Sequence, residues 1–72
     1  MARQYLVVLE QGDTTWGAYV PDLPGCTAVG DTEEEVLRLI TEAIDFHLEA
    51  LAEAGQEIPP PRNQVRMVEV AG

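Results

Sequence analysis

One stretch decides the fold of this chain: Val20-Pro21-Asp22-Leu23-Pro24-Gly25-Cys26-Thr27-Ala28-Val29-Gly30-Asp31-Thr32. Pro21 restricts the preceding residue to extended backbone, so a strand that ends at Val20 stays extended up to the turn. Pro24-Gly25 suits the two central positions of a type II turn, because proline presets the first and glycine accepts positive φ at the second. The chain therefore reverses here. The predicted structural turn consists of Pro21, Asp22, Pro24, Gly25 and Gly30, with Asp22 able to cap the turn.

A helix is predicted directly after this turn. It begins at Asp31 or Thr32, because Thr32 and Glu35 have the spacing of a capping box and three glutamates occupy the positive first turn. Gly55 is expected to end it. The apolar stripe expected against a sheet is Val36, Ile40, Ala43, Ile44, His47, Leu48 and Leu51.

After the turn a strand is predicted at Cys26-Thr27-Ala28-Val29, and three further segments have the pattern of strands. Residues 3–10 and 14–20 flank a hairpin turn at Gln11-Gly12-Asp13, and residues 64–70 follow a stiff connector of three prolines, 59–61. The element order is therefore β-β-β-α-β, an α+β two-layer sandwich in one domain, residues 1–72. A right-handed crossover returns the last strand parallel to the first, which gives the spatial strand order 3-2-1-4.

Several residues are candidates for an interaction surface. Leu39 and Phe46 widen the apolar arc of the helix beyond what one sheet needs, and Trp16 belongs either to the core or to an interface. The opposite helix face is acidic, through Glu42, Asp45 and Glu49, and is either a solvated face or a docking surface. The predicted partner or oligomer surface comprises Trp16, Leu39, Phe46, Glu42, Asp45, Glu49 and Asp22.

Charge and composition limit the possible functions. The formal net charge is −9, with four arginines, no lysine and 13 acidic residues, whereas direct binding to nucleic acid needs a basic surface. An acidic surface suits a basic partner or simply keeps a small protein in solution. A 72-residue chain buries little apolar surface, so self-association or partner binding is expected to supplement its stability. No apolar stretch is long enough to cross a bilayer, and a cytoplasmic location with no membrane contact is expected.

Catalytic chemistry has little support in the sequence. Cys26 has no basic neighbour that would lower its pKa, and it is interpreted as a small buried hydrophobe. His47 lies on the predicted buried stripe without a second histidine or a cysteine near it, so a metal site is not supported. Glu10, the glutamates at the helix start and Glu69 are sufficient in number for a two-metal nuclease but are better explained by the helix dipole and by strand exposure. No catalytic residue, cofactor or metal is predicted.

The chain resembles a known family over most of its length, from Tyr5 to about Pro61. The block x-Pro-Asp-Leu-Pro-Gly-Cys-x-x-x-Gly-Asp-Thr-x-x-Glu is similar to the core of HicB-type antitoxins and their single-domain HicB-like relatives. The resemblance implies a partial RNase H-like fold and a non-catalytic protein that neutralises a small basic RNA-cleaving toxin, HicA, by covering the surface that the toxin uses on RNA.

Two functional interpretations stay open at this point. One is an antitoxin-like protein that binds a HicA-type toxin. The other is a solitary HicB-like homo-oligomer, a dimer or tetramer, with another partner or ligand. Full-length members of the family also carry a C-terminal DNA-binding domain, and no such segment is expected in residues 1–72, so transcriptional repression does not follow from the resemblance.

Overall fold

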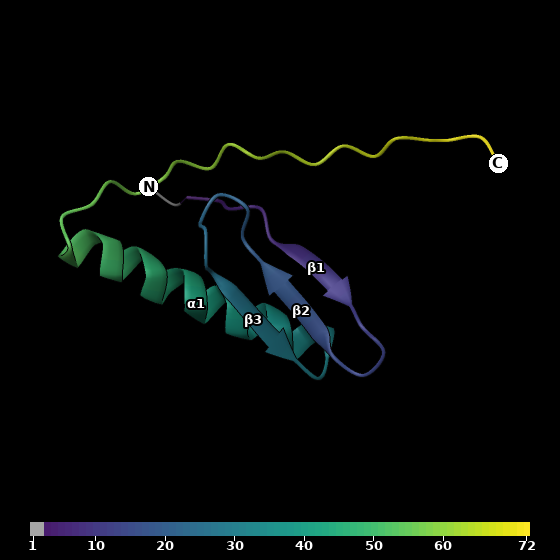
Figure 1. The fold of residues 1–72 in the computed structure, drawn as a ribbon, viewed down its shortest axis with the longest axis horizontal. Helices are drawn as coiled ribbons and strands as arrows, with labels where there is room; N and C mark the ends of the chain where they lie inside the picture. The colour runs from purple at the N-terminus through teal and green to yellow at the C-terminus, as the bar shows by residue number, and fades with distance from the viewer. Residues whose placement is uncertain (1–2) are drawn as a thin grey trace.

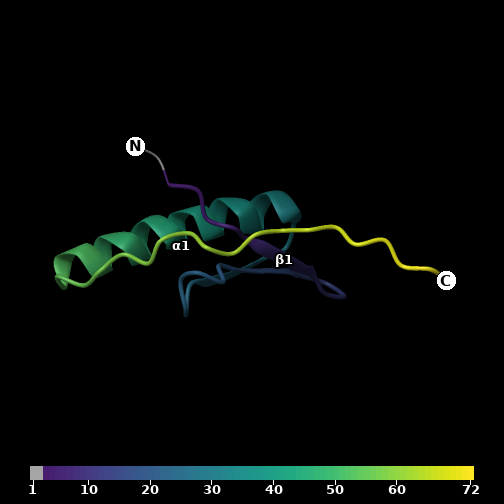
Figure 2. The same cartoon turned by 90° about the horizontal axis from the view of Figure 1, so that it is seen from above.

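The computed structural model describes residues 3–72 and shows a two-layer α+β fold (Figure 1). Its elements are β1 (Val8–Gln11), β2 (Trp16–Tyr19), β3 (Thr27–Gly30) and α1 (Glu33–Glu53). The three strands form an antiparallel sheet in the order β1-β2-β3. Seen from above, α1 lies along one side and the strands along the other, so a single helix covers one face of the sheet (Figure 2).

Short turns determine the register of the sheet. In the first hairpin the Gly12 N–H donates to the Thr15 carbonyl at 2.8 Å, and Val8 then lies opposite Tyr19. In the second, Ala18 lies opposite Ala28. Because strand side chains alternate between faces, Leu9, Ala18 and Ala28 share the face toward the helix, and Val8, Tyr19 and Thr27 share the opposite face.

The β2–β3 connection consists of two consecutive turns. The Leu23 N–H donates to the Val20 carbonyl at 3.0 Å, and the Cys26 N–H donates to the Leu23 carbonyl at 3.0 Å. Gly25 has φ +86°, as the third position of a type II turn requires, and Pro24 precedes it. The Val20 N–H then donates to the Cys26 carbonyl at 3.1 Å, which closes the base of the loop.

Both ends of α1 have defined caps. The Thr32 hydroxyl accepts from the Glu35 N–H at 3.0 Å, and the Glu35 carboxylate accepts from the Asp31 N–H at 3.1 Å, so the two side chains satisfy backbone donors reciprocally. At the other end the N–H groups of Gly55 and Gln56 donate to the carbonyls of Ala52 and Leu51, a Schellman arrangement with Gly55 at φ +70°.

The hydrophobic core is small and lies between the helix and the second hairpin. Leu23, Val36 and Ile40 are fully buried, and the remaining buried members are Ala18, Val20 and Cys26. Leu23 is the one fully buried residue supplied by a turn, so the β2–β3 loop is part of the core rather than a surface connection. Side chains from β1 and from the later helix turns pack around this cluster and are partly buried.

Gly30 lies in tight contact with the first turn of α1. A Cβ built on Gly30 would lie 3.0 Å from the Val36 backbone nitrogen and 3.2 Å from the Val36 Cα. Backbone atoms cannot move aside as the end of a side chain can. Gly30 is therefore required where β3 passes the first turn of α1.

The fourth strand predicted at residues 64–70 is absent from the single chain. Strand order 3-2-1 is observed, but the described residues after Gln56 contain no helix or strand, and Val65, Met67, Val68 and Val70 are exposed. Two contacts explain the path: the Tyr5 hydroxyl donates to the Pro59 carbonyl at 2.6 Å, and the Asn63 side-chain amide donates to an Asp22 carboxylate oxygen at 2.6 Å. The prediction of an intrachain strand beside β1 is therefore wrong for this structure.

β1 and β2 are shorter than predicted, β3 begins and ends one residue later than predicted, and the helix agrees with its expected limits. Regular pairing in β1 begins at Val8 rather than near residue 3. Of the predicted helix stripe, Val36 and Ile40 are buried and the rest are half-buried. No helix within residues 3–72 is long and apolar enough to cross a membrane.

Replacing Gly25 by alanine is expected to lower the free energy of unfolding by about 1–2 kcal/mol, because an L side chain is strained at positive φ although space is available around it. Pro24→Ala is the matched control and should cost less, since it mainly raises the entropy of the unfolded chain. Urea midpoints measured by circular dichroism test the order. A larger loss for Pro24→Ala would contradict the turn assignment.

Candidate interaction surface

The acidic face of α1 is a regular feature of the helix surface. Glu42, Asp45 and Glu49 are all exposed and follow each other at spacings of three and four residues, so they lie on one side of the helix. The helix begins with three further glutamates, Glu33 to Glu35, near its positive end, where the helix dipole favours them. Glu42, Asp45 and Glu49 therefore form an exposed row of carboxylates that no described element covers.

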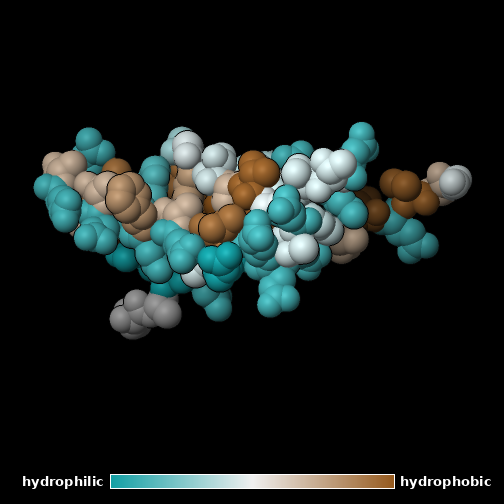
Figure 3. Space-filling model, turned by 90° about the horizontal axis from the view of Figure 1, so that it is seen from below, coloured by the Kyte–Doolittle hydropathy of each residue, from teal (hydrophilic) through white to brown (hydrophobic). Residues whose placement is uncertain are grey.

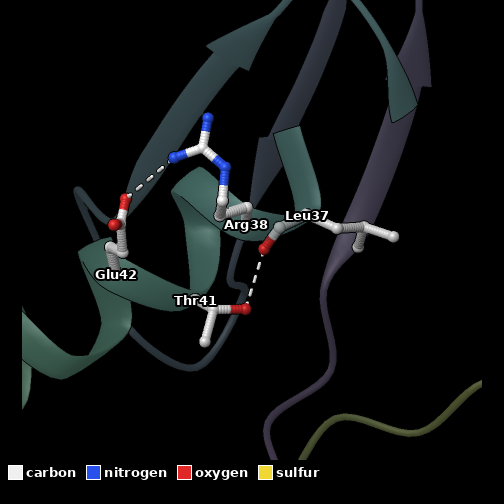
Figure 4. A network of polar contacts seen from close by, with 4 residues as sticks. All are labelled: Leu37, Arg38, Thr41 and Glu42. Atoms are coloured by element: carbon white, nitrogen blue, oxygen red, sulfur yellow. Dashed lines mark hydrogen bonds and ion pairs between the residues drawn. The ribbon is translucent and has the colours of Figure 1, made fainter. Parts of the chain in front are cut away.

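One of these carboxylates has a cationic neighbour. The Arg38 guanidinium lies 3.7 Å from the Glu42 carboxylate, one turn away along the helix (Figure 4). Both side chains are more than 60% exposed, so solvent and salt weaken the pair. The row is therefore partly neutralised at its N-terminal end, and Asp45 and Glu49 carry its unpaired charge among the described residues. The i, i+4 spacing of Arg38 and Glu42 is the sequence signal that predicts this pair.

Asp22 has a structural role in addition to its charge. Its two carboxylate oxygens accept from the Asn63 backbone N–H at 3.3 Å and from the Asn63 side-chain amide at 2.6 Å. It therefore holds the C-terminal connector against the β2–β3 turn and is separate from the acidic row of α1. The expectation that Asp22 caps the turn is replaced by this long-range contact, which no local motif predicts.

The apolar candidates do not share one environment. Trp16 is half-buried and packs against the core, and Leu39 is half-buried, whereas Phe46 is 74% exposed. Exposed hydrophobic side chains also include Tyr19 and Val29 on the open sheet face and Leu37 on the helix. Seen from below, hydrophobic side chains gather along the middle of the molecule, and a separate group stands at the C-terminal end (Figure 3).

Cys26, His47 and the acidic residues are the side chains that the sequence analysis considered for catalysis or metal binding. Residues 3–72 contain no group of three or more His, Cys, Asp or Glu side chains that could hold a metal ion. Cys26 is buried, and desolvation raises the pKa of its thiol, which disfavours the nucleophilic thiolate. His47 is half-buried on the helix. What the structure offers is an acidic helix face, an exposed phenylalanine and open sheet edges, features of a small binding domain.

Comparisons with known proteins identify the family. The family model described as the HicB_like antitoxin of bacterial toxin–antitoxin systems matches residues 5–70. The chain belongs to this family. Among solved structures, it is similar to a chain of the HicA3 and HicB3 toxin–antitoxin complex, with a TM-score of 0.69 and 30% identity over 82% of this chain and 70% of that one.

Similar curated proteins include one named as an antitoxin. An uncharacterised 14.9 kDa protein of Haemophilus phage HP1 is 38% identical over 55 residues, 76% of this chain and 41% of that protein. The UPF0150 protein ssr1765 of Synechocystis is 43% identical over 76% of this chain and 71% of its own length. Antitoxin HicB 2 of Photorhabdus laumondii is 34% identical over 81% of this chain and 42% of its own length. The chain thus spans about two fifths of the phage and Photorhabdus proteins.

Replacing Thr32 by alanine is expected to lower the free energy of unfolding by about 1 kcal/mol, because the Glu35 N–H loses its acceptor at the helix start. Thr41→Ala is the matched control. The Thr41 hydroxyl donates to the Leu37 carbonyl at 2.7 Å in mid-helix (Figure 4), and alanine has the higher helix propensity, so stability should be unchanged or slightly raised. Equal losses in denaturant titrations would contradict the capping role.

Proposed function

We propose that this protein is a non-catalytic antitoxin-like module that binds a small basic HicA-type toxin through its acidic helix face. The likeness to a chain of the HicA3 and HicB3 toxin–antitoxin complex is the observation that carries the proposal. The net charge of −9 supports it, because opposite charges favour encounter with a basic protein. In this proposal the toxin is inactivated when the surface that it uses on RNA is covered.

The exposed row Glu42, Asp45 and Glu49 is the part of the chain best suited to this contact. These side chains project from a long helix that is capped at both ends, so binding requires little ordering of the backbone. The neighbouring Phe46 is 74% exposed and offers an apolar anchor beside the charges. An exposed aromatic ring next to carboxylates matches the composition of protein interfaces.

The alternative function is that of a solitary HicB-like oligomer with another partner. It is favoured by Phe46 and by the open edges of a three-stranded sheet, which self-association would cover as well as a toxin would. The neighbouring reading frame distinguishes the two functions. If it encodes a small basic protein with a catalytic histidine, the toxin partner is favoured.

The proposal also includes a fourth strand that completes a partial RNase H-like sheet. A partial RNase H-like sheet with order 3-2-1-4 needs a strand beside β1, on the edge opposite β2. Residues 64–70 lie within the range matched by the family model, which supports their membership in the domain. The strand is then formed only when the protein assembles with a partner.

Neutralising the helix row is expected to slow association with a HicA-type toxin. In the variant Glu42→Gln/Asp45→Asn/Glu49→Gln the association rate should fall about tenfold at low salt, because electrostatic steering depends on these charges. The rate for the unaltered protein should itself fall as salt shortens the Debye length toward about 8 Å at physiological ionic strength. Surface plasmon resonance across a salt series, with an RNA-cleavage protection assay, makes the measurement.

The matched control is Glu10→Gln/Asp13→Asn/Glu57→Gln, which removes the same charge from exposed positions away from the helix row. It should reduce the association rate less than the helix variant does. Both variants should unfold at similar denaturant concentrations, because exposed charges contribute little to folding. Asp22 is left unchanged in both, since its contact with Asn63 would confound the comparison. Absent binding, or binding indifferent to salt and to the helix row, would exclude the acidic docking surface.

Self-association is the second part of the proposal. Light scattering at high micromolar concentration is expected to give a mass of a dimer or tetramer rather than the 7.9 kDa of one chain. The physical reason is the exposed apolar surface on α1 and along the sheet, which a 72-residue domain leaves uncovered. A monomer at this concentration would exclude self-association, and the exposed apolar residues would then need a different protein as their partner.

A further inference from the structure

The C-terminal segment, residues 64–70, contains no helix or strand, and every one of its residues is exposed. Val65, Met67, Val68 and Val70 are 57–94% exposed. Its side-chain hydrogen bonds are local, from Arg66 to the Val65 carbonyl and to the Gln64 side chain. Four large hydrophobic side chains exposed within six residues have the composition of a strand that is covered on both faces.

The path of the connector directs this segment away from its own sheet. Tyr5 holds Pro59 and Asp22 holds Asn63, so the chain crosses the end of the sheet where β1 begins and β2 ends. Beyond Asn63 it continues past the strands, and the C-terminus lies at one extreme of the molecule (Figures 1 and 2). The radius of gyration of 14.1 Å reflects this projection, since a compact chain of this length has about 11 Å.

A receiving site is present at the free edge of β1. β1 pairs with β2 on one side, and no described strand lies on its other edge. The residues of β1 and its lead-in are apolar on both faces, with Val7 and Leu9 against the core and Val8 on the opposite face. Leu37, 40% exposed, points from α1 toward the side on which β1 runs (Figure 4). A strand added at this edge would cover these groups and pair the unpaired backbone of β1.

We infer that residues 64–70 of one copy add as a fourth strand to the β1 edge of a second copy, and that the exchange is reciprocal in a two-fold dimer. This inference rests on the proposed self-association and identifies its interface; it is independent of toxin binding. Seven extended residues span about 23 Å, enough to cover the whole of β1 and its lead-in. Reciprocal exchange makes the interface self-complementary, as two-fold symmetry requires.

The apolar pattern of the segment favours a second copy of this chain as the occupant. In an extended segment Val65 and Met67 lie on one face and Val68 and Val70 on the other, which matches an edge with half-buried hydrophobic side chains on both faces. The segment is neutral, because it contains one arginine and one glutamate. The β3 edge is a poorer receiver, because α1 packs mainly against β3 and β2 and leaves the hydrophobic side chains of β1 only half-buried. Exchange therefore brings the apolar segment of each copy onto the apolar β1 edge of the other.

The first measurement is the dimer dissociation constant of the full chain by analytical ultracentrifugation. Met67→Pro/Val68→Pro is expected to raise it at least tenfold, because consecutive N–H groups point to opposite sides and one of the two must face the partner strand. Proline is apolar, and Met67 and Val68 are 94% and 78% exposed in the single chain, so the circular dichroism spectrum of the body should not change. The matched control, Met67→Ile/Val68→Ile, keeps both N–H groups and should retain the dimer.

Two results would overturn the inference at this stage. A proline variant that dimerises like the unaltered chain would show that strand pairing does not form the interface. Loss of the dimer in Phe46→Ser, with the proline variant unaffected, would assign association to the helix surface instead. Either result would contradict strand exchange but leave the proposed self-association intact. A monomeric unaltered chain would contradict both strand exchange and self-association, so the two outcomes are distinguishable.

The second measurement locates the contact. In an equimolar mixture of 13C-labelled and unlabelled chains, isotope-filtered nuclear Overhauser spectra should connect the methyl groups of Val65, Val68 or Met67 in one copy with those of Leu6 or Val8 in the other. Contacts within one chain only would mean that the segment folds onto its own β1. An absence of any contact would mean that the segment is free. Both outcomes would overturn strand exchange.

Discussion

The burial of Leu23 within the β2–β3 turn is the contact on which the rest of the structure depends. Leu23 is fully buried with Val36 and Ile40 from the helix, and the backbone around it is closed by bonds to Val20 and Cys26. The two turns place this side chain under the sheet only because Gly25 accepts positive φ. The loop therefore adds a large buried side chain, Leu23, to the core in addition to those of the short strands. In so small a domain, the burial of one such side chain is a large share of the free energy of unfolding.

The helix position follows from the same loop through Gly30 and Thr32. β3 can run closely past the helix start because Gly30 has no side chain, and the chain then enters α1 through the Thr32 and Glu35 cap. This geometry leaves Glu42, Asp45 and Glu49 on the far side from the core. The burial of the apolar face of α1 against the sheet therefore turns the acidic face toward solvent. The orientation of that face is determined by hydrophobic packing and not by the charges.

Features encoded within a few residues could be predicted from the sequence, and features that need a distant partner could not. The type II turn at Pro24-Gly25, the cap at Thr32 and the order of the first three strands all depend on local backbone preferences and on period. The contact between Asp22 and Asn63 joins residues 41 apart, and no local pattern indicates it. The strand pattern at residues 64–70 was recognised, but a pattern specifies only which residues prefer extended backbone and does not name the strand with which they pair.

The C-terminal segment links the physics of the small core to the proposed assembly. A chain of 72 residues that leaves four large hydrophobic side chains exposed in one segment forgoes burial that it needs for stability. The connector is held at Pro59 and Asn63 by hydrogen bonds, and the segment after it runs past the strands (Figure 1). In the proposed dimer, pairing with a second copy keeps both bonds and buries the segment. Folding and association would then be coupled, because the contacts that hold the connector in one copy also present its last strand to the other.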